Sequence, residues 1–187
     1  MKIYRYPSPA AEKRLLKIEQ RGTSFRRKDI AAVQRILEAV RKQGDAALLQ
    51  YSRQFDAPRI KLDQLRVTRE EIAAAVRQVE PGFKRALNRA ARQIASFHTR
   101  QRSNSWMDTP RPGTLLGQMV HPVDAAGVYV PGGQSGSTPL VSSVLMGIIP
   151  AKIAGVSEII MATPPTRDGE VSPYLLAAAQ KAGVTSV

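Results

Sequence analysis

Gly127-Val-Tyr-Val-Pro-Gly-Gly133, Pro139-Leu-Val-Ser-Ser-Val-Leu-Met146 and Ile149-Pro-Ala-Lys-Ile-Ala-Gly155 are the stretches that decide the fold of this 187-residue chain. The first predicts an apolar strand over 127–130 that runs into a glycine-rich loop. The others predict an apolar helix over 140–154, and a second strand follows over 158–162. Together they form a βαβ unit, whose loop lies at the carboxyl edge of a parallel sheet. Because open α/β sheets bind ligands at that edge, we expect a binding site there.

The segment after this unit extends the same pattern. It predicts a helix over 173–182 and the start of a third parallel strand over Val184–Val187, where the sequence stops without a turn or a polar tail. A parallel strand needs neighbours on both sides and covered faces. The pattern therefore predicts the front part of a longer protein, with a parallel sheet that further residues would complete.

The first half of the chain is predicted to be helical. Apolar spacing indicates helices over 28–42, 45–55, 68–79 and 82–100, and Thr68-Arg-Glu-Glu71 matches a capping box at the start of the third. The polar stretch Ser103–Pro112 is interpreted as a connector, and a strand is predicted over 115–120. This reading divides the chain into a mainly helical, basic region over 1–105 and an incomplete sheet domain over 113–187.

Composition limits the classes of protein that fit. Hydrophobic residues make up 43% of the sequence, but no run is long enough to span a membrane. The amino-terminal residues lack the apolar core of a signal peptide, and the absence of cysteine excludes disulfides and thiolate metal sites. These features favour a cytoplasmic protein.

The net positive charge of the chain comes from its first half. Residues 1–102 hold 24 Lys and Arg against 10 Asp and Glu, whereas residues 103–187 hold 4 against 5. A basic half can indicate a nucleic-acid-binding module. Because the basic residues are interspersed with acidic ones, and because aromatic residues do not alternate with them, the pattern favours a solvated helical surface instead.

The glycine-rich loop matches no standard nucleotide signature. It lacks the lysine of a P-loop and the G-x-G-x-x-G spacing of the usual dinucleotide fingerprint. Its glycines nevertheless allow close backbone approach, and Tyr129 could lay its ring against a flat ligand. The alternative is a tight turn that needs glycine for backbone reasons alone. Thr163-Pro-Pro165 leaves the same edge, either as a rigid apolar wall or as a simple strand terminator.

The chain offers no recognisable metal site. His98 and His121 are its two histidines, and neither belongs to an H-E-x-x-H arrangement or lies near an acidic cluster in the sequence. His98 follows Phe97 on a predicted helix and is interpreted as a packed or capping side chain.

Several separate blocks, in order, resemble histidinol dehydrogenase. They are Gly127–Gly133, Ser142–Met146, Ile149–Gly155 and Thr163–Pro165, and in the first half Gly44–Leu48, Tyr51, Phe55-Asp56, Phe97-His98 and Gln101. The resemblance begins near Arg26. It implies an α/β fold with a helical N-terminal region, followed by the first half of a Rossmann-like, aldehyde-dehydrogenase-like parallel-sheet domain. The loop between Gly133 and Ser142 is longer than the family's commonest pattern.

The resemblance also implies a function. The family performs the NAD-dependent four-electron oxidation of L-histidinol to L-histidine through L-histidinal, as a zinc-dependent homodimer. It implies NAD contacts for Tyr129, Pro131 and Pro164 and a substrate contact for Ser142. It assigns no catalytic residue and no zinc ligand to this chain, since the matching positions lie in a part of the family that this sequence does not contain.

The isolated chain is therefore expected to be inactive as a dehydrogenase. Besides a structural remnant whose only partner is the rest of its own enzyme, two alternatives stay open at this point. One is a paralogous NAD-dependent alcohol dehydrogenase on the same scaffold, acting on a different small alcohol. The other is the basic nucleic-acid-binding module, whose binding would be salt-sensitive.

Overall fold

A computed structural model describes residues 3–20, 27–132 and 139–187 and separates into two compact units, Met1–Tyr51 and Ser52–Val187. The first unit contains α1 (Pro9–Glu19), α2 (Arg27–Gln43) and most of α3 (Asp45–Phe55), which runs on into the second unit. Helix α1 was not predicted from the sequence. Ser8 followed by Pro9 is a sequence signal for a helix start. In the structure the Ser8 hydroxyl accepts a hydrogen bond from the Ala11 amide, and Pro9 takes the first helical position.

Helices α2 and α3 confirm the predictions for 28–42 and 45–55. Gly44 separates them with φ of +58°, a backbone conformation that favours glycine. The apolar residues that predicted α2 do form one stripe, yet Ile30, Val33 and Leu37 are exposed. The periodicity thus identified the helix without indicating burial.

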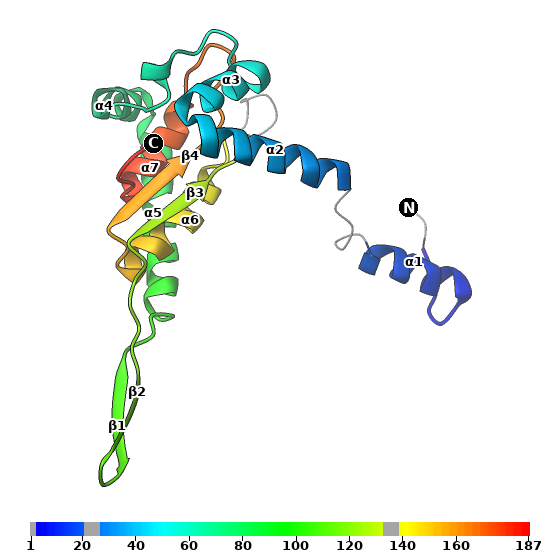
Figure 1. Cartoon of the computed structure of the whole chain (residues 1–187), viewed down its shortest axis with the longest axis vertical. Coiled ribbons are helices and arrows are strands. Elements are labelled where there is room, and N and C mark those ends of the chain that lie inside the picture. Colours follow the sequence, from blue (N-terminus) through cyan, green and yellow to red (C-terminus); the bar gives the residue numbers. More distant parts are fainter. Residues whose placement is uncertain (1–2, 21–26, 133–138) are drawn as a thin grey trace. The chain divides into compact units, whose positions relative to one another are not determined.

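The second unit is built on the predicted βαβ unit (Figure 1). Strand β3 (Ala125–Tyr129) pairs in parallel with β4 (Glu158–Ala162), and α6 (Val141–Ala154) connects them. The pairing register runs from Ala125 opposite Glu158 to Tyr129 opposite Ala162. The two strands therefore end level with each other, and the loops that follow them leave the same edge of the sheet.

Residues 184–187 lie beside β4 as a third parallel segment, which confirms that prediction. The Thr185 amide donates to the Ile159 carbonyl at 2.8 Å, and the Met161 amide donates to the Ser186 carbonyl at 2.9 Å. The Val67 amide, just before the Thr68 cap, donates to the Val187 carbonyl at 2.9 Å. This last bond ties the connection before α4 (Arg69–Gln78) to the third segment.

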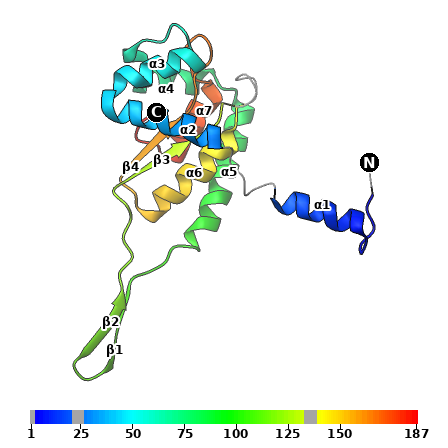
Figure 2. The same cartoon turned by 45° about the vertical axis from the view of Figure 1, so that its right-hand side comes forward.

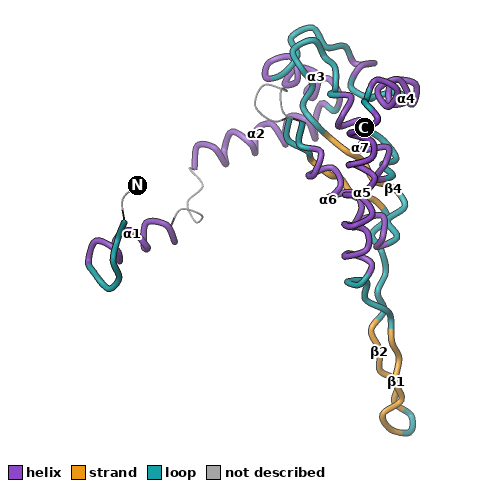
Figure 3. The backbone as a smooth tube through the Cα atoms, turned by 180° about the vertical axis from the view of Figure 1, so that it is seen from behind, coloured by secondary structure: helices purple, strands orange, loops and turns teal. Residues whose placement is uncertain are grey.

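Four helices form the core with one face of the strand pair. Helix α6 packs against β3 and β4, α5 (Pro81–Thr99) and α7 (Pro173–Ala182) pack against α6, and α4 packs against α7. Figures 2 and 3 show α5 and α6 side by side from two directions. A short 3-10 helix, η2 (Leu62–Gln64), precedes α4. On β4, Ile159 and Met161 point into this core, whereas Ile160 on the opposite face is exposed.

Both helices that lead into the strands end in the same way. Gly155 after α6 and Gly183 after α7 adopt φ of +92° and +94°. The Val156 amide bonds the Ala151 carbonyl and the Val184 amide bonds the Ala179 carbonyl, each at 3.1 Å. This is the pattern of a Schellman motif, which satisfies the last carbonyls of a helix and turns the chain sharply. It returns the chain to the amino edge of the sheet, where each following parallel segment begins.

The interpretation of Ser103–Pro112 as a connector was wrong. Residues Trp106–Arg111 form β1, which pairs antiparallel with β2 (Thr114–Gln118), as Figure 1 shows. Pro110, which is unfavourable inside a regular ladder, falls where the register shifts between Asp108 and Arg111. A proline is tolerated at such an irregularity because no regular ladder bond is lost there. Gly113, with φ of +73°, makes the turn.

Helix α5 confirms the prediction for 82–100, but its apolar stripe is covered over part of its length. Leu87 and Ala91 are buried, whereas Phe97, in the last turn, is exposed.

None of the helices in the described ranges is both long enough and apolar enough to cross a membrane.

We predict that Gly147→Ala destabilises the second unit. A Cβ at this position of α6 would lie 2.5 Å from Val128 Cγ1 on β3, so the helix and the strand would have to move apart. Overpacking of this kind costs about 1–3 kcal/mol. Urea unfolding measures it. Gly127→Ala is the matched control, because a Cβ there meets nothing within 4 Å. Equal stability of the two variants would contradict the close packing of α6 on β3.

We predict a pH-dependent contribution from the capping box of α4. Glu71 Oε2 accepts from the Thr68 amide at 2.6 Å and from the Thr68 hydroxyl at 2.8 Å. These bonds hold the pKa of Glu71 below its usual 4.5, so their stabilisation is present above that value and is lost as the pH falls through the lowered pKa. Glu71→Ala should cost about 1 kcal/mol at pH 7 and less below pH 4.

Urea unfolding at several pH values checks this, with Glu70→Ala as the control in the same helical turn. A cost for Glu71→Ala that does not change with pH, or that Glu70→Ala matches, would contradict the role of the capping box.

Candidate functional site

The candidate site lies where β3 and β4 end. Beyond the strands, the Val130 amide donates to the Ala162 carbonyl at 2.8 Å, which extends the ladder by one step. Val130 is fully buried, whereas Tyr129 beside it is 69% exposed. Because side chains alternate along a strand, Val130 anchors the edge in the core while Tyr129 faces outward.

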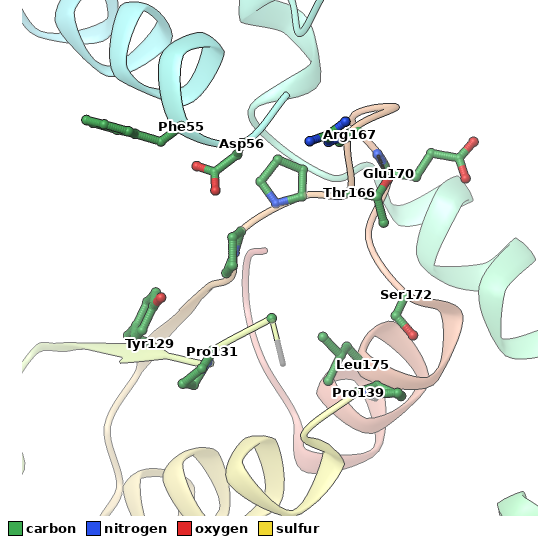
Figure 4. A pocket seen from close by; sticks show the side chains of 13 residues that line it. Phe55, Asp56, Tyr129, Pro131, Pro139, Thr166, Arg167, Glu170, Ser172 and Leu175 are labelled. Atoms are coloured by element: carbon green, nitrogen blue, oxygen red, sulfur yellow. Dashed lines mark hydrogen bonds between the residues drawn. The ribbon is translucent and has the colours of Figure 1, made fainter. Parts of the chain in front are cut away.

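A pocket of about 670 Å³ opens at this edge (Figure 4). A volume of this size falls within the range of small-molecule sites. Three stretches that are distant in the sequence supply its walls: the end of α3, the loop after β3, and the loop after β4 together with the start of α7. The lining residues are Phe55, Asp56, Tyr129, Pro131, Gly132, Pro139, Pro164, Pro165, Thr166, Arg167, Glu170, Ser172 and Leu175.

The structure brings together three of the residues that the sequence analysis selected. Tyr129, Pro131 and Pro164 all line the pocket. Ser142, the fourth, lies in the first turn of α6, is exposed and is not among the lining residues. The glycine-rich loop was the first predicted feature of this region. Its residues 133–138 lie outside the described part of the chain.

The loop after β3 and the loop after β4 touch each other. A Cβ on Gly132 would lie 2.9 Å from Pro164 Cγ, so the absence of a side chain allows the two loops to meet. The pair Pro164-Pro165 therefore does more than end a strand, because it forms a rigid apolar wall against which the first loop rests.

A tight turn after Pro164 and Pro165 carries charged residues of the pocket lining. The Thr166 amide donates to the Glu170 carbonyl at 2.8 Å, and the Gly169 amide donates to the Thr166 carbonyl at 2.9 Å. Arg167 and Glu170 stand on this turn and both line the pocket. Phe55, the last residue of α3, and Asp56, which follows it, also line the pocket. Sequence reasoning did not select them for the site, since nothing local indicates that a helix end meets this sheet edge.

Another wall is fixed by a contact between α7 and α5. Ser172 and Leu175 line the pocket, and Tyr174 between them turns away from it. The Tyr174 hydroxyl donates to Glu80 Oε2 at 3.0 Å, and its ring meets Phe83 edge-on with 4.8 Å between centroids. The hydrogen bond to the Glu80 carboxylate, together with its negative charge, raises the pKa of Tyr174 above 10.

No metal site is formed within the residues that the structure describes, since no group of three His, Asp or Glu side chains gathers there. His98 Nδ1 lies 2.6 Å from Gln101 Oε1 at the end of α5, a contact between two side chains rather than a bond to a helix-end carbonyl.

The geometry defines an α/β protein that carries a ligand-sized pocket at the carboxyl edge of a parallel sheet. A family model described as histidinol dehydrogenase matches residues 19–187. Relatives include the histidinol dehydrogenases of Desulfotalea psychrophila, 53% identical over 157 residues, and of Nitratidesulfovibrio vulgaris, 50% identical over 155 residues. The chain belongs to the histidinol dehydrogenase family.

A solved structure agrees with this assignment. The crystal structure of histidinol dehydrogenase from Elizabethkingia anophelis superposes with a TM-score of 0.83 at 32% identity, over 98% of this chain and 41% of that one. The alignments with the two curated relatives cover 84% and 83% of this chain but 36% of each relative. This chain therefore spans little more than a third of the length of the family members it matches.

We predict that Tyr174 titrates above pH 10 and that Glu80→Gln lowers its pKa toward 10, because the amide carries no charge to hold the phenol proton. Since the folded-state pKa is raised, this contribution to stability is present below pH 10 and is lost as the pH rises through the raised value. Ultraviolet titration of the tyrosines measures the pKa. The Tyr174→Phe variant shows which part of the absorbance change belongs to Tyr174. An unchanged pKa in Glu80→Gln would contradict the contact.

Proposed function

We propose that this chain is the N-terminal part of a histidinol dehydrogenase, which oxidises L-histidinol to L-histidine through L-histidinal in histidine biosynthesis. The observation that carries the proposal is the pocket at the ends of β3 and β4, in a chain that matches the family over residues 19–187. In this proposal residues 1–105 form the helical region, and residues 113–187 form the first part of the NAD-binding domain.

The pocket residues fit the flat rings of a dinucleotide. The exposed ring of Tyr129 offers an aromatic face with a hydroxyl at its edge, and aromatic faces favour stacked contact. Pro131 and Pro164 also line the pocket and supply apolar surface there. Because the contact between Gly132 and Pro164 holds both loops in place, these residues can orient a ring without rearranging. NAD⁺ accepts hydride when bound, and the part of this chain is to hold it.

The family also implies zinc, for which the residues described here do not fit. They include no cluster of three His, Asp or Glu side chains that could hold an ion. We therefore derive no step through a metal and assign no catalytic residue or metal ligand to this chain. Ser142 remains a proposed substrate contact on the first turn of α6.

The proposal extends to the setting of the enzyme. We place the complete protein in the cytoplasm as a homodimer that acts on L-histidinol as a small-molecule substrate, without a membrane or a nucleic acid as partner. The exposed stripe of α2 and the exposed face of β4 are consistent with a chain that has further contacts to make.

A chimeric enzyme tests the proposal. In the histidinol dehydrogenase of Desulfotalea psychrophila, the aligned segment is replaced by the matching residues of this chain, and NADH formation from L-histidinol is followed at 340 nm. We expect turnover by the chimera and none by the 187-residue chain alone. Tyr129→Ala in the chimera should raise the KM for NAD⁺ about tenfold through lost stacking, and Tyr129→Phe should retain most of the affinity.

The parent enzyme is the positive control, and circular dichroism verifies that each variant folds. Turnover of another small alcohol but not of L-histidinol would identify a paralogous dehydrogenase. Turnover of L-histidinol by the isolated chain would overturn its assignment as a part that lacks the catalytic residues. Salt-sensitive binding of the chain to DNA, without any binding of NAD⁺, would favour the nucleic-acid-binding alternative.

A further inference from the structure

Asp56 places on the pocket wall a carboxylate that the proposed cofactor contacts do not use. It follows the last residue of α3 and lines the pocket together with Phe55. Its side chain makes no hydrogen bond or ion pair within the part of the chain that the structure describes. A half-buried carboxylate without a partner is available to accept hydrogen bonds from a ligand.

The backbone around Asp56 is fixed. The amides of Asp56 and Ala57 both donate to the Ser52 carbonyl, at 3.0 and 2.9 Å. Ala57 is fully buried, and Arg53 Nε donates to the carbonyl of the buried Ile60 at 2.9 Å. The turn that carries Asp56 is thus held by backbone hydrogen bonds and by the buried residues that follow it. Its carboxylate reaches the pocket from a rigid position, which is what selective recognition requires.

The second carboxylate of the lining is placed differently. Figure 4 shows the Asp56 carboxylate on the side of the pocket where Tyr129 and Pro131 lie, whereas the Glu170 carboxylate points away from the pocket. Glu170 is also exposed on its turn. Asp56 is therefore the carboxylate that a ligand held against Tyr129 and the prolines would meet.

We propose that Asp56 accepts hydrogen bonds from the adenosine ribose of the bound dinucleotide and so selects NAD⁺ over NADP⁺. This inference rests on the proposed function. A carboxylate can accept hydrogen bonds from the 2′- and 3′-hydroxyls of a ribose, and it repels the 2′-phosphate that distinguishes NADP⁺. The adenosine half suits this pocket because it needs a flat wall and a diol acceptor, both of which are present. The nicotinamide half would also need the groups that react with the alcohol.

Calorimetric titration of the 187-residue chain with NAD⁺, NADP⁺, 5′-AMP and 2′,5′-ADP tests the proposal. The two smaller probes isolate the adenosine half. We expect the wild-type chain to bind NAD⁺ and 5′-AMP at least tenfold more tightly than their 2′-phosphorylated counterparts. Asp56→Asn should reduce both ratios at least fivefold, and Asp56→Glu should restore part of the preference. Asp63→Asn, which removes the same charge from an exposed position outside the pocket, should leave both ratios unchanged.

The outcomes separate the two proposals. Binding of 5′-AMP and NAD⁺ by the wild type, with ratios that Asp56→Asn does not change, would overturn the role of Asp56 and leave the cofactor site standing. No binding of NAD⁺ or 5′-AMP by the wild type would overturn the cofactor pocket itself, and the role of Asp56 with it. Each ratio compares the affinities of one variant for two ligands. A general loss of stability would weaken the binding of both ligands alike and would leave the ratio unchanged.

Discussion

Helix α6 rests on β3 so closely that Gly147 has room for no side chain, and the rest of the second unit depends on this contact. A Cβ there would lie 2.5 Å from Val128 Cγ1. The contact seats the connecting helix directly on the strand pair, where Val144, Leu145 and Ile148 are buried against it. With the crossover held there, β3 and β4 pair in a register that brings their carboxyl ends level. The pocket exists because two loops leave that edge together.

Each wall of the pocket is held by a different interaction, and two of these interactions lie outside the pocket lining. The loops after β3 and β4 rest on each other where Gly132 meets Pro164. The start of α7 is held by the bond from Tyr174 to Glu80 on α5. The end of α3 is held by buried Ala57 and Ile60. The contacts of Tyr174, Ala57 and Ile60 thus position these walls from outside the pocket. This is the arrangement expected of a preorganised site.

The differences between prediction and structure have particular causes. The capping box at Thr68 and Glu71 was predicted correctly because both partners lie within four residues. The hairpin of β1 and β2 was missed because Pro110 is acceptable only where the register shifts, and that position depends on the partner strand. Phe55 and Asp56 were not selected for the site because nothing near them in the sequence reports that the end of α3 faces the ends of β3 and β4.

The sequence by itself determined the βαβ unit, the helix boundaries set by glycines and caps, the third parallel segment and the resemblance to histidinol dehydrogenase. These rest on local periodicity, on turn residues and on ordered motifs, all of which are properties of neighbouring residues. Only the tertiary structure decided which distant segments share the pocket, that Ser142 lies outside its lining, and that Asp56 faces the same side as Tyr129. Those facts depend on how the helices pack on the strand pair, and packing joins residues that the sequence keeps far apart.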